Sequence, residues 1–295
     1  MTEKAASRPS SEINEAFLSA ARSGRLDRLR MLLPLANPDA QTPEGRTALA
    51  NAAKMRRADC VRALIGKTNA RLADKDGNTA LIWAAFEGEP ECVKLLIPHS
   101  DANATDSSRK TALMWAAEAG CEKSVQALIP VSDASLRDIW GNTALMAAAA
   151  NGHADVLRAL MAASDILAQN ENGETALIEA CGVFHPDGLE CIGLLARAMG
   201  AGGIERKDNS QRDALDHIVE SKRWEALDIF IGLASPQRLD RALEKAGAIN
   251  FPRWAAHREA EAIASAAGLG AAAVQDRRLT GPRSPQAPNR RPRAL

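Results

Sequence analysis

Residues 74–97 read DKDGNTALIWAAFEGEPECVKLLI, and this stretch decides the fold because its pattern returns along the chain. Its fragment Thr-Ala-Leu begins at positions 32 residues apart, namely Thr47, Thr79, Thr111, Thr143 and Thr175. A fixed period of this length is the signature of a repeat protein, in which each unit buries its apolar face against its neighbours. The sequence therefore predicts a stack of similar units.

The repeat extends beyond these five positions. One step of 32 residues back reaches Glu15-Ala16-Phe17, and a step of 38 residues forward reaches Asp213-Ala214-Leu215. We place the six additional residues of that longer step near 184–189. Seven units result, and a more degenerate eighth unit would begin at Arg241-Ala242-Leu243.

Each unit has the composition of a turn followed by two helices. Asp74 and Gly77 favour a tight turn, Thr79 is suited to cap the first helix, and Gly88 is suited to end it. Val93 and Leu96 stand one helical turn apart and predict the buried face of the second helix. The pair recurs in other units as Leu29/Leu32, Val61/Leu64, Val125/Leu128 and Leu157/Leu160.

This pattern resembles the ankyrin repeat. The family signature Thr-(Pro/Ala)-Leu-x-x-Ala-Ala-x-x-Gly is met by residues 79–88, 111–120 and 143–152. The sequence departs from it where Arg56 and Phe184 replace the glycine after the first helix and Arg109 replaces the turn glycine. The resemblance covers about residues 13–234 and implies an all-α ankyrin-repeat solenoid of seven to eight helix-turn-helix units.

The remaining segments of the chain flank this array in the sequence. We expect residues 1–12 to be disordered, residues 235–269 to form C-terminal capping helices, and residues 270–295 to be a disordered basic tail. The first eleven residues are polar, and eighteen apolar residues nowhere follow one another. The five cysteines are scattered rather than grouped. We therefore expect a reduced, cytoplasmic monomer with no membrane span, no cofactor and no metal.

The net charge of zero conceals two opposite parts. Six arginines against one aspartate give the tail a charge of +5 and leave −5 on the remainder; they are Arg277, Arg278, Arg283, Arg290, Arg291 and Arg293, against Asp276. The tail is interpreted as a solubilising end or as an arm for nucleic acid or an anionic surface. It also resembles the arginine-rich C-terminal signals of bacterial type IV secretion substrates, without the last arginine of that pattern.

One pair of residues has the chemistry of a nucleophile and its base. Cys121 and His153 both follow the glycine that ends the first helix, in consecutive units. Catalysis would require hydrogen-bond reach of about 3 Å between them, and the spacing of stacked helices, roughly 8 to 10 Å, works against it. The resemblance implies a framework histidine here. A thiol enzyme therefore remains the least favoured alternative.

The resemblance implies that a partner protein binds the concave side, which is built from the turns and the first helices. Trp83 and Trp115 occupy the same position of consecutive units, Phe86 lies one turn beyond Trp83, and Ile139 and Trp140 fall at a turn tip. Trp83 and Trp115 are alternatively interpreted as filling the seam between units. Charged residues form the predicted rim: Glu87, Arg109, Lys110 and Glu118.

These patterns predict a non-enzymatic protein–protein interaction module. The first alternative is a bacterial secreted effector that uses the same surface on a host protein, and the second is the Cys121/His153 thiol enzyme.

Overall fold

The computed structural model describes residues 8–182, 188–245, 247 and 254–259, and of residues 8–10 it describes the backbone alone. The described part of the chain divides into two compact units, one that ends at residue 235 and one that begins at residue 236. The basic tail and residues 1–7 lie outside the described residues, and so do the predictions made for them. No described helix has both the length and the hydropathy that crossing a membrane requires.

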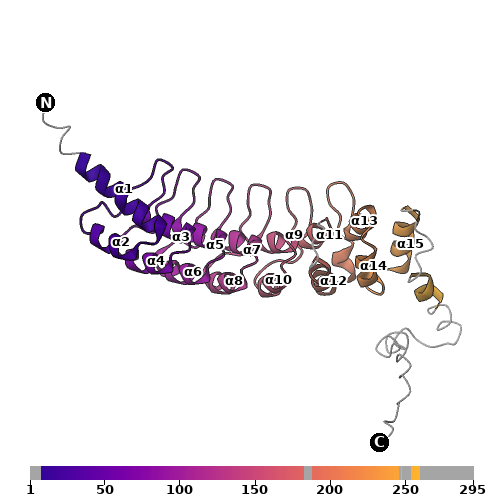
Figure 1. Cartoon of the computed structure of the whole chain (residues 1–295). Coiled ribbons are helices and arrows are strands. Elements are labelled where there is room, and N and C mark those ends of the chain that lie inside the picture. Colours follow the sequence, from indigo (N-terminus) through magenta and orange to yellow (C-terminus); the bar gives the residue numbers. More distant parts are fainter. Residues whose placement is uncertain (1–7, 183–187, 246, 248–253, 260–295) are drawn as a thin grey trace, which may run out of the picture. The chain divides into compact units, whose positions relative to one another are not determined.

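The first of these two compact units contains seven consecutive helix pairs, each of which is one repeat unit. This confirms the predicted all-α repeat architecture (Figure 1). The first helices form one row, the second helices form a second row, and the turns project from the opposite edge as fingers. The pairs are α1 (Arg8–Ser23) with α2 (Leu26–Leu32), α3 (Ala48–Lys54) with α4 (Ala58–Leu64), α5 (Ala80–Phe86) with α6 (Pro90–Leu96), α7 (Ala112–Glu118) with α8 (Glu122–Leu128), α9 (Ala144–Ala150) with α10 (Ala154–Met161), α11 (Ala176–Gly182) with α12 (Gly188–Ile204), and α13 (Ala214–Glu220) with α14 (Trp224–Phe230).

The repeated threonine precedes five of the first helices, α3, α5, α7, α9 and α11, as predicted. The Thr79 hydroxyl accepts a hydrogen bond from the Ile82 backbone N–H at 3.3 Å, which satisfies one of the free donors at the helix start. The threonines of the neighbouring units make the same bond. In the last pair, Asp213 replaces threonine and forms a capping box with Asp216.

The predicted core positions are buried, except Leu32, which is partly exposed. Val93 and Leu96 are fully buried, and so are Ala84 and Ala85 on the first helix of the same unit. The small alanines let α5 contact both α3 and α7 closely. Apolar burial of this kind is the main term that stabilises a solenoid, because each unit completes the core of the next.

The fingers, which lie between one helix pair and the next, are joined edge to edge by backbone hydrogen bonds. The Ser107 N–H donates to Asp76 O at 2.8 Å, and the Ile139 N–H donates to Ser108 O at 3.0 Å. Equivalent bonds join the fingers on either side of these. Arg109 and Arg56 replace glycine without changing the turns, since both adopt the left-handed backbone with φ of 58°.

We predicted that all six additional residues are inserted near 184–189, but only some of them are. Thr47 and Cys60 are 13 residues apart, whereas Thr175 and the buried Cys191 are 16 apart, so three residues enter before Cys191 and three after it. The later three lengthen α12, in which Gly200 interrupts the helical backbone with φ of 62°. Residues 183–187, including Phe184, lie outside the described residues.

The start of the array and the expected eighth unit differ from what we predicted. Helix α1 begins at Arg8, so residues 8–12 are helical rather than disordered. In the second compact unit, α15 (Pro236–Lys245) already contains Arg241, so no repeat unit begins there. Trp254 donates its indole N–H to Asp240 Oδ1 of α15 at 2.8 Å. The capping role of residues 235–269 stays a prediction.

Candidate functional site

The surface made by the fingers and the exposed sides of the first helices is called the inner face here. Three of the exposed large apolar side chains lie on it, namely Phe86 (45% exposed), Ile139 (41%) and Trp140 (53%). Phe86 ends α5, and the other two stand on the finger that precedes α9. The inner face of consecutive units therefore carries apolar side chains that are partly exposed to solvent.

Trp83 and Trp115 are half-buried and anchored at one edge. Each indole N–H donates to the aspartate of its own finger at 2.9 Å, Trp83 to Asp74 Oδ2 and Trp115 to Asp106 Oδ2. Phe86 stands between them, with its ring centroid 5.8 Å from Trp83 and 5.0 Å from Trp115, both edge to face. The three rings form an aromatic row across α5 and α7.

The predicted charged rim consists largely of ion pairs within and between units. Lys110 Nζ lies 2.6 Å from Glu118 Oε2. The same ammonium lies 4.2 Å from the ring centroid of Trp115 and 5.9 Å from that of Trp140. Glu87 pairs with Arg56 of the preceding unit at 3.5 Å. Lys110 therefore brings the aromatic row and Trp140 into one surface.

Ile139, Trp140 and Arg109 occupy the finger tips, as predicted. Ile139 is tied by its backbone to Ser108, and the Trp140 N–H donates to Asp138 Oδ1 at 2.9 Å. The Arg109 side chain is exposed. The backbone of the finger is thus fixed while its side chains remain accessible.

Sequence reasoning missed a pocket of about 180 Å³ beside Trp140. It is lined by small and flexible apolar residues of α7 and α9, by Trp140 and by four charged groups; besides Trp140 these residues are Met114, Met146, Ala147, Ala150, Lys110, Glu118, Asp138 and Glu179. The signal in the sequence was Ala147, which stands where the two preceding units have Trp83 and Trp115. We call this hollow the Ala147 pocket.

Glu179 is a titratable residue that lines the Ala147 pocket. Burial and the negative charges of Glu174 and Asp138 together raise the pKa of its carboxyl to about 7, against a hydrogen bond from Asn170 that lowers it. That bond runs from Asn170 Nδ2 to Glu179 Oε1 at 3.0 Å. The pocket therefore contains a carboxyl that changes charge near neutral pH.

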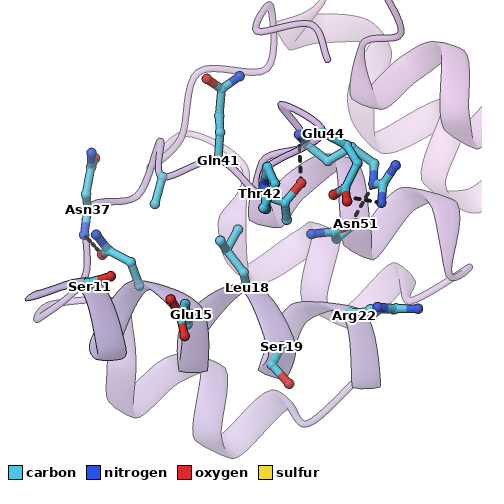
Figure 2. A pocket seen from close by; sticks show the side chains of 14 residues that line it. Ser11, Glu15, Leu18, Ser19, Arg22, Asn37, Gln41, Thr42, Glu44 and Asn51 are labelled. Carbon is cyan, nitrogen blue, oxygen red and sulfur yellow. Dashed lines mark hydrogen bonds and ion pairs between the residues drawn. The ribbon is translucent and has the colours of Figure 1, made fainter. Parts of the chain in front are cut away.

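A larger open groove of about 750 Å³ lies between α1 and the first finger (Figure 2). Its polar groups bond one another: Arg46 Nη2 lies 3.3 Å from Glu44 Oε2, and the Asn37 N–H donates to Asn14 Oδ1 at 2.8 Å. Leu18 contributes apolar surface, and the lining contains no aromatic side chain. The groove therefore lacks the aromatic residue types that dominate interface energetics.

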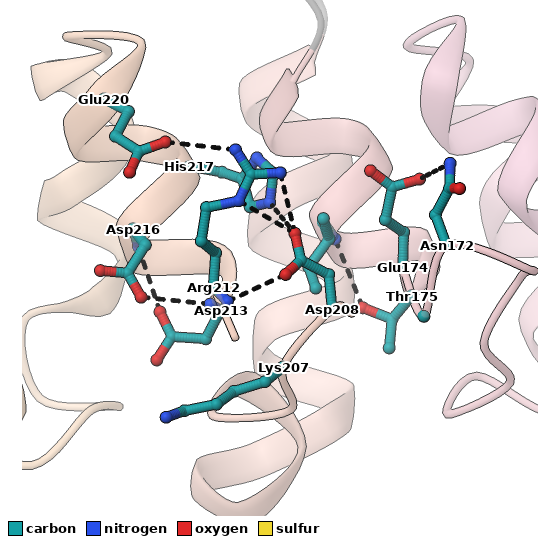
Figure 3. A network of polar contacts seen from close by, with 12 residues as sticks. Asn172, Glu174, Thr175, Lys207, Asp208, Arg212, Asp213, Asp216, His217 and Glu220 are labelled. Carbon is teal, nitrogen blue, oxygen red and sulfur yellow. Dashed lines mark hydrogen bonds and ion pairs between the residues drawn. The ribbon is translucent and has the colours of Figure 1, made fainter. Parts of the chain in front are cut away.

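One cluster has the residue types of a metal site. Ligand atoms of Glu174, Asp208 and His217 lie within 4.8 Å of one another. Arg212 already places its guanidinium 3.0 Å from the buried Asp208 carboxylate, and His217 Nε2 lies 2.9 Å from the same oxygen (Figure 3). Burial raises the pKa of Asp208, but hydrogen bonds from Arg212 and His217 outweigh it and hold the pKa below its ordinary value. Because the guanidinium supplies the cation, we interpret the cluster as structural.

Cys121 and His153 each bond a carbonyl of the preceding unit. The Cys121 thiol donates to Gly88 O at 3.3 Å and lies 3.1 Å from Ser124 Oγ. His153 Nε2 lies 3.0 Å from Glu118 O. These contacts fit the framework role that the family resemblance implied, since they tie one unit to the next.

The other four cysteines are buried: Cys60, Cys92, Cys181 and Cys191. Burial raises the pKa of the Cys60 and Cys181 thiols and raises that of Cys92 to about 12. A thiol with a raised pKa stays protonated and reacts slowly. These thiols have the properties of core residues.

The helix pairs, their joined fingers and the inner face define a helical repeat protein. A family model described as ankyrin repeats (3 copies) matches residues 17–106, 63–135, 96–170 and 113–208, and the chain belongs to the ankyrin-repeat family. Ankyrin repeats are generally protein-interaction modules. No curated protein matches the chain.

Proposed function

We propose that this chain is a non-enzymatic module that binds a partner protein on its inner face, centred on Trp140. The observation that carries the proposal is the 53% exposure of Trp140 on a finger whose backbone is fixed on both sides. A rigid, exposed tryptophan exposes apolar area to water without stabilising the fold. Tryptophan is also the residue type most enriched among interface positions that dominate binding energy.

The neighbouring residues support one continuous contact area. Phe86, Lys110 and Trp140 belong to three consecutive units. Phe86 contacts Trp115 edge to face, and the Lys110 ammonium lies 4.2 Å from the ring centroid of Trp115 and 5.9 Å from that of Trp140. Glu118 is held at 2.6 Å from Lys110, so the charged groups are already oriented. Preorganised side chains lose little conformational entropy on binding, which favours affinity.

The experiment is a capture of partners from a cell extract with the full chain, followed by affinity measurement on the purified partner. Trp140→Ala is expected to weaken binding at least roughly thirtyfold, which corresponds to about 2 kcal/mol. Its melting curve should match that of the wild type, because the side chain is mostly exposed.

The matched control is Val131→Ala, since Val131 is exposed to the same degree as Phe86 (45%) but follows α8 in the row of second helices. This variant should bind as the wild type does. If Trp140→Ala binds normally while Val131→Ala loses the partner, the inner face is not the binding surface.

A further inference from the structure

Four of the units share a pairing between the first helix and its finger. The residue four positions after the capping residue bonds the residue five positions before it. In the units that contain Trp83 and Trp115, the indole N–H donates to the finger aspartate at 2.9 Å. In later units the same pairing joins Glu179 to Asn170 at 3.0 Å and His217 to Asp208 at 2.9 Å.

The pairing is absent at Ala147, whose methyl group cannot donate. The partner in that unit is Asp138, which is only 4% exposed. Its Oδ1 accepts the Trp140 and Asn142 backbone N–H groups at 2.9 and 2.8 Å. Among the described side chains, the donor to its Oδ2 is Asn142 Nδ2 at 3.4 Å, beyond the usual range of about 2.7 to 3.2 Å. A buried carboxylate oxygen is therefore left at the Ala147 pocket with a weak donor.

We propose that the Ala147 pocket receives one lysine or arginine side chain of the partner, whose N–H group donates to Asp138 in the position that the indole N–H takes in the preceding units. This rests on the proposed function and names the chemistry of the partner. The volume of about 180 Å³ suits one side chain, since pockets for small-molecule ligands measure roughly 300 to 1,000 Å³.

The charges of the pocket favour a cation. Asp138, Glu118 and Glu179 line it against one base, Lys110, which is already paired with Glu118 at 2.6 Å. Asp138 and Glu179 therefore remain without an opposite charge among the lining residues. The exposed Trp140 ring supplies a face on which a cation is attracted. An apolar occupant would remove Asp138 from water without giving it a donor, which is unfavourable.

The experiment uses small probes on the full chain. Nα-acetyl-arginine amide and Nα-acetyl-lysine amide are titrated while the indole ¹H–¹⁵N signal of Trp140, assigned from Trp140→Phe, is followed. Nα-acetyl-citrulline amide is the neutral control of the same shape as the arginine probe. We expect a saturable shift with a cationic probe and none with citrulline, and the two cationic probes decide between arginine and lysine.

Two variants test the site itself. Ala147→Trp restores the residue of the preceding units and should abolish the shift while the melting curve shows a folded protein. Glu179→Gln keeps the shape, removes one negative charge, and should weaken binding of the cationic probe by up to roughly fivefold at pH 8, where the Glu179 carboxyl is ionised. Equal responses to arginine and citrulline, an unchanged response in Ala147→Trp, or no saturable shift with either cationic probe would overturn the proposal.

The partner assay separates the two proposals. If Trp140→Ala loses the partner and Ala147→Trp retains it, the inner face binds but the pocket does not receive a side chain. If Trp140→Ala retains the partner, the proposed function itself fails, whatever the small probes do.

Discussion

Phe86 of one unit meets Trp115 of the next edge to face, with ring centroids 5.0 Å apart and planes at 76°. Phe86 is 45% exposed, whereas Trp115 is half-buried and bonded to its finger aspartate. One aromatic contact therefore joins a surface residue to a structural one. Edge-to-face pairs of this kind contribute about 0.5 to 1.5 kcal/mol beyond the area that they bury.

Trp115→Ala should destabilise the fold, and Trp140→Ala should not. The substitution of Trp115 removes its ring contact with Phe86 and the indole N–H that donates to Asp106. We therefore expect the free energy of unfolding to fall by about 2 to 4 kcal/mol. For the exposed Trp140 we expect a change within about 0.5 kcal/mol. Urea unfolding followed by circular dichroism measures both variants. Similar midpoints for the two would show that the contacts of Trp115 do not stabilise the solenoid.

The repeat itself could be predicted from the sequence, because period, capping threonines and paired apolar positions are local signals. The position of Ile139 and Trp140 at a finger tip could be predicted by counting along the repeat. The place of Phe86 between Trp83 and Trp115 depends on side-chain directions in neighbouring units, which spacing alone does not give. The Ala147 pocket was missed because it arises from a small residue where a large one recurs.

The left-handed turns make a second test. Arg109 holds φ of 58° in its finger, a conformation that costs a residue with a Cβ about 1 kcal/mol. Arg109→Gly should therefore stabilise the protein slightly, by about 0.5 kcal/mol after the greater freedom of glycine in the unfolded chain is counted. Thermal unfolding of the variant against the wild type measures the difference, and a lower melting temperature would contradict it.

The matched opposite change is Gly77→Ala in the preceding finger. Gly77 has φ of 82°, and a Cβ there would lie 2.9 Å from the Cα of Asp106 in the next finger. Because backbone must move to relieve this contact, we expect a loss of more than about 1 kcal/mol. Unchanged stability would mean that the fingers are less tightly joined than their hydrogen bonds indicate.

Alkylation of the folded protein should separate the cysteines. Cys121 is partly exposed, whereas the other four are at most 1% exposed. With iodoacetamide at pH 8, one label at Cys121 should precede any other, and the rest should react after unfolding. Peptide mass spectrometry over time locates the label. Labelling of Cys60 or Cys92 as fast as Cys121 would show that the second helices open readily.

The sign of the pH dependence follows from Glu179. Its pKa is raised from an ordinary value of 4.5 to about 7 in the folded chain, so the folded state holds this proton more strongly than the unfolded state does. The contribution to stability is complete below pH 4.5 and is lost as the pH rises through about 7. Since the side chain is only partly buried, we expect a loss on the order of 1 kcal/mol.

Glu179→Gln should therefore reduce the difference in stability between pH 5 and pH 8. Other charged groups remain in the variant. Asp138, Glu174, Lys110 and Glu118 act on Glu179 or line its pocket, and Asp208, Arg212 and His217 lie on the far side of Glu174. Glu118→Gln is the matched control, because it removes a carboxylate from the same pocket and leaves Glu179 in place. Urea midpoints at the two pH values measure all three proteins. If wild type and Glu179→Gln lose the same stability between pH 5 and pH 8, Glu179 does not titrate in this window, and the affinity of the pocket for a cationic probe should then be independent of pH there as well.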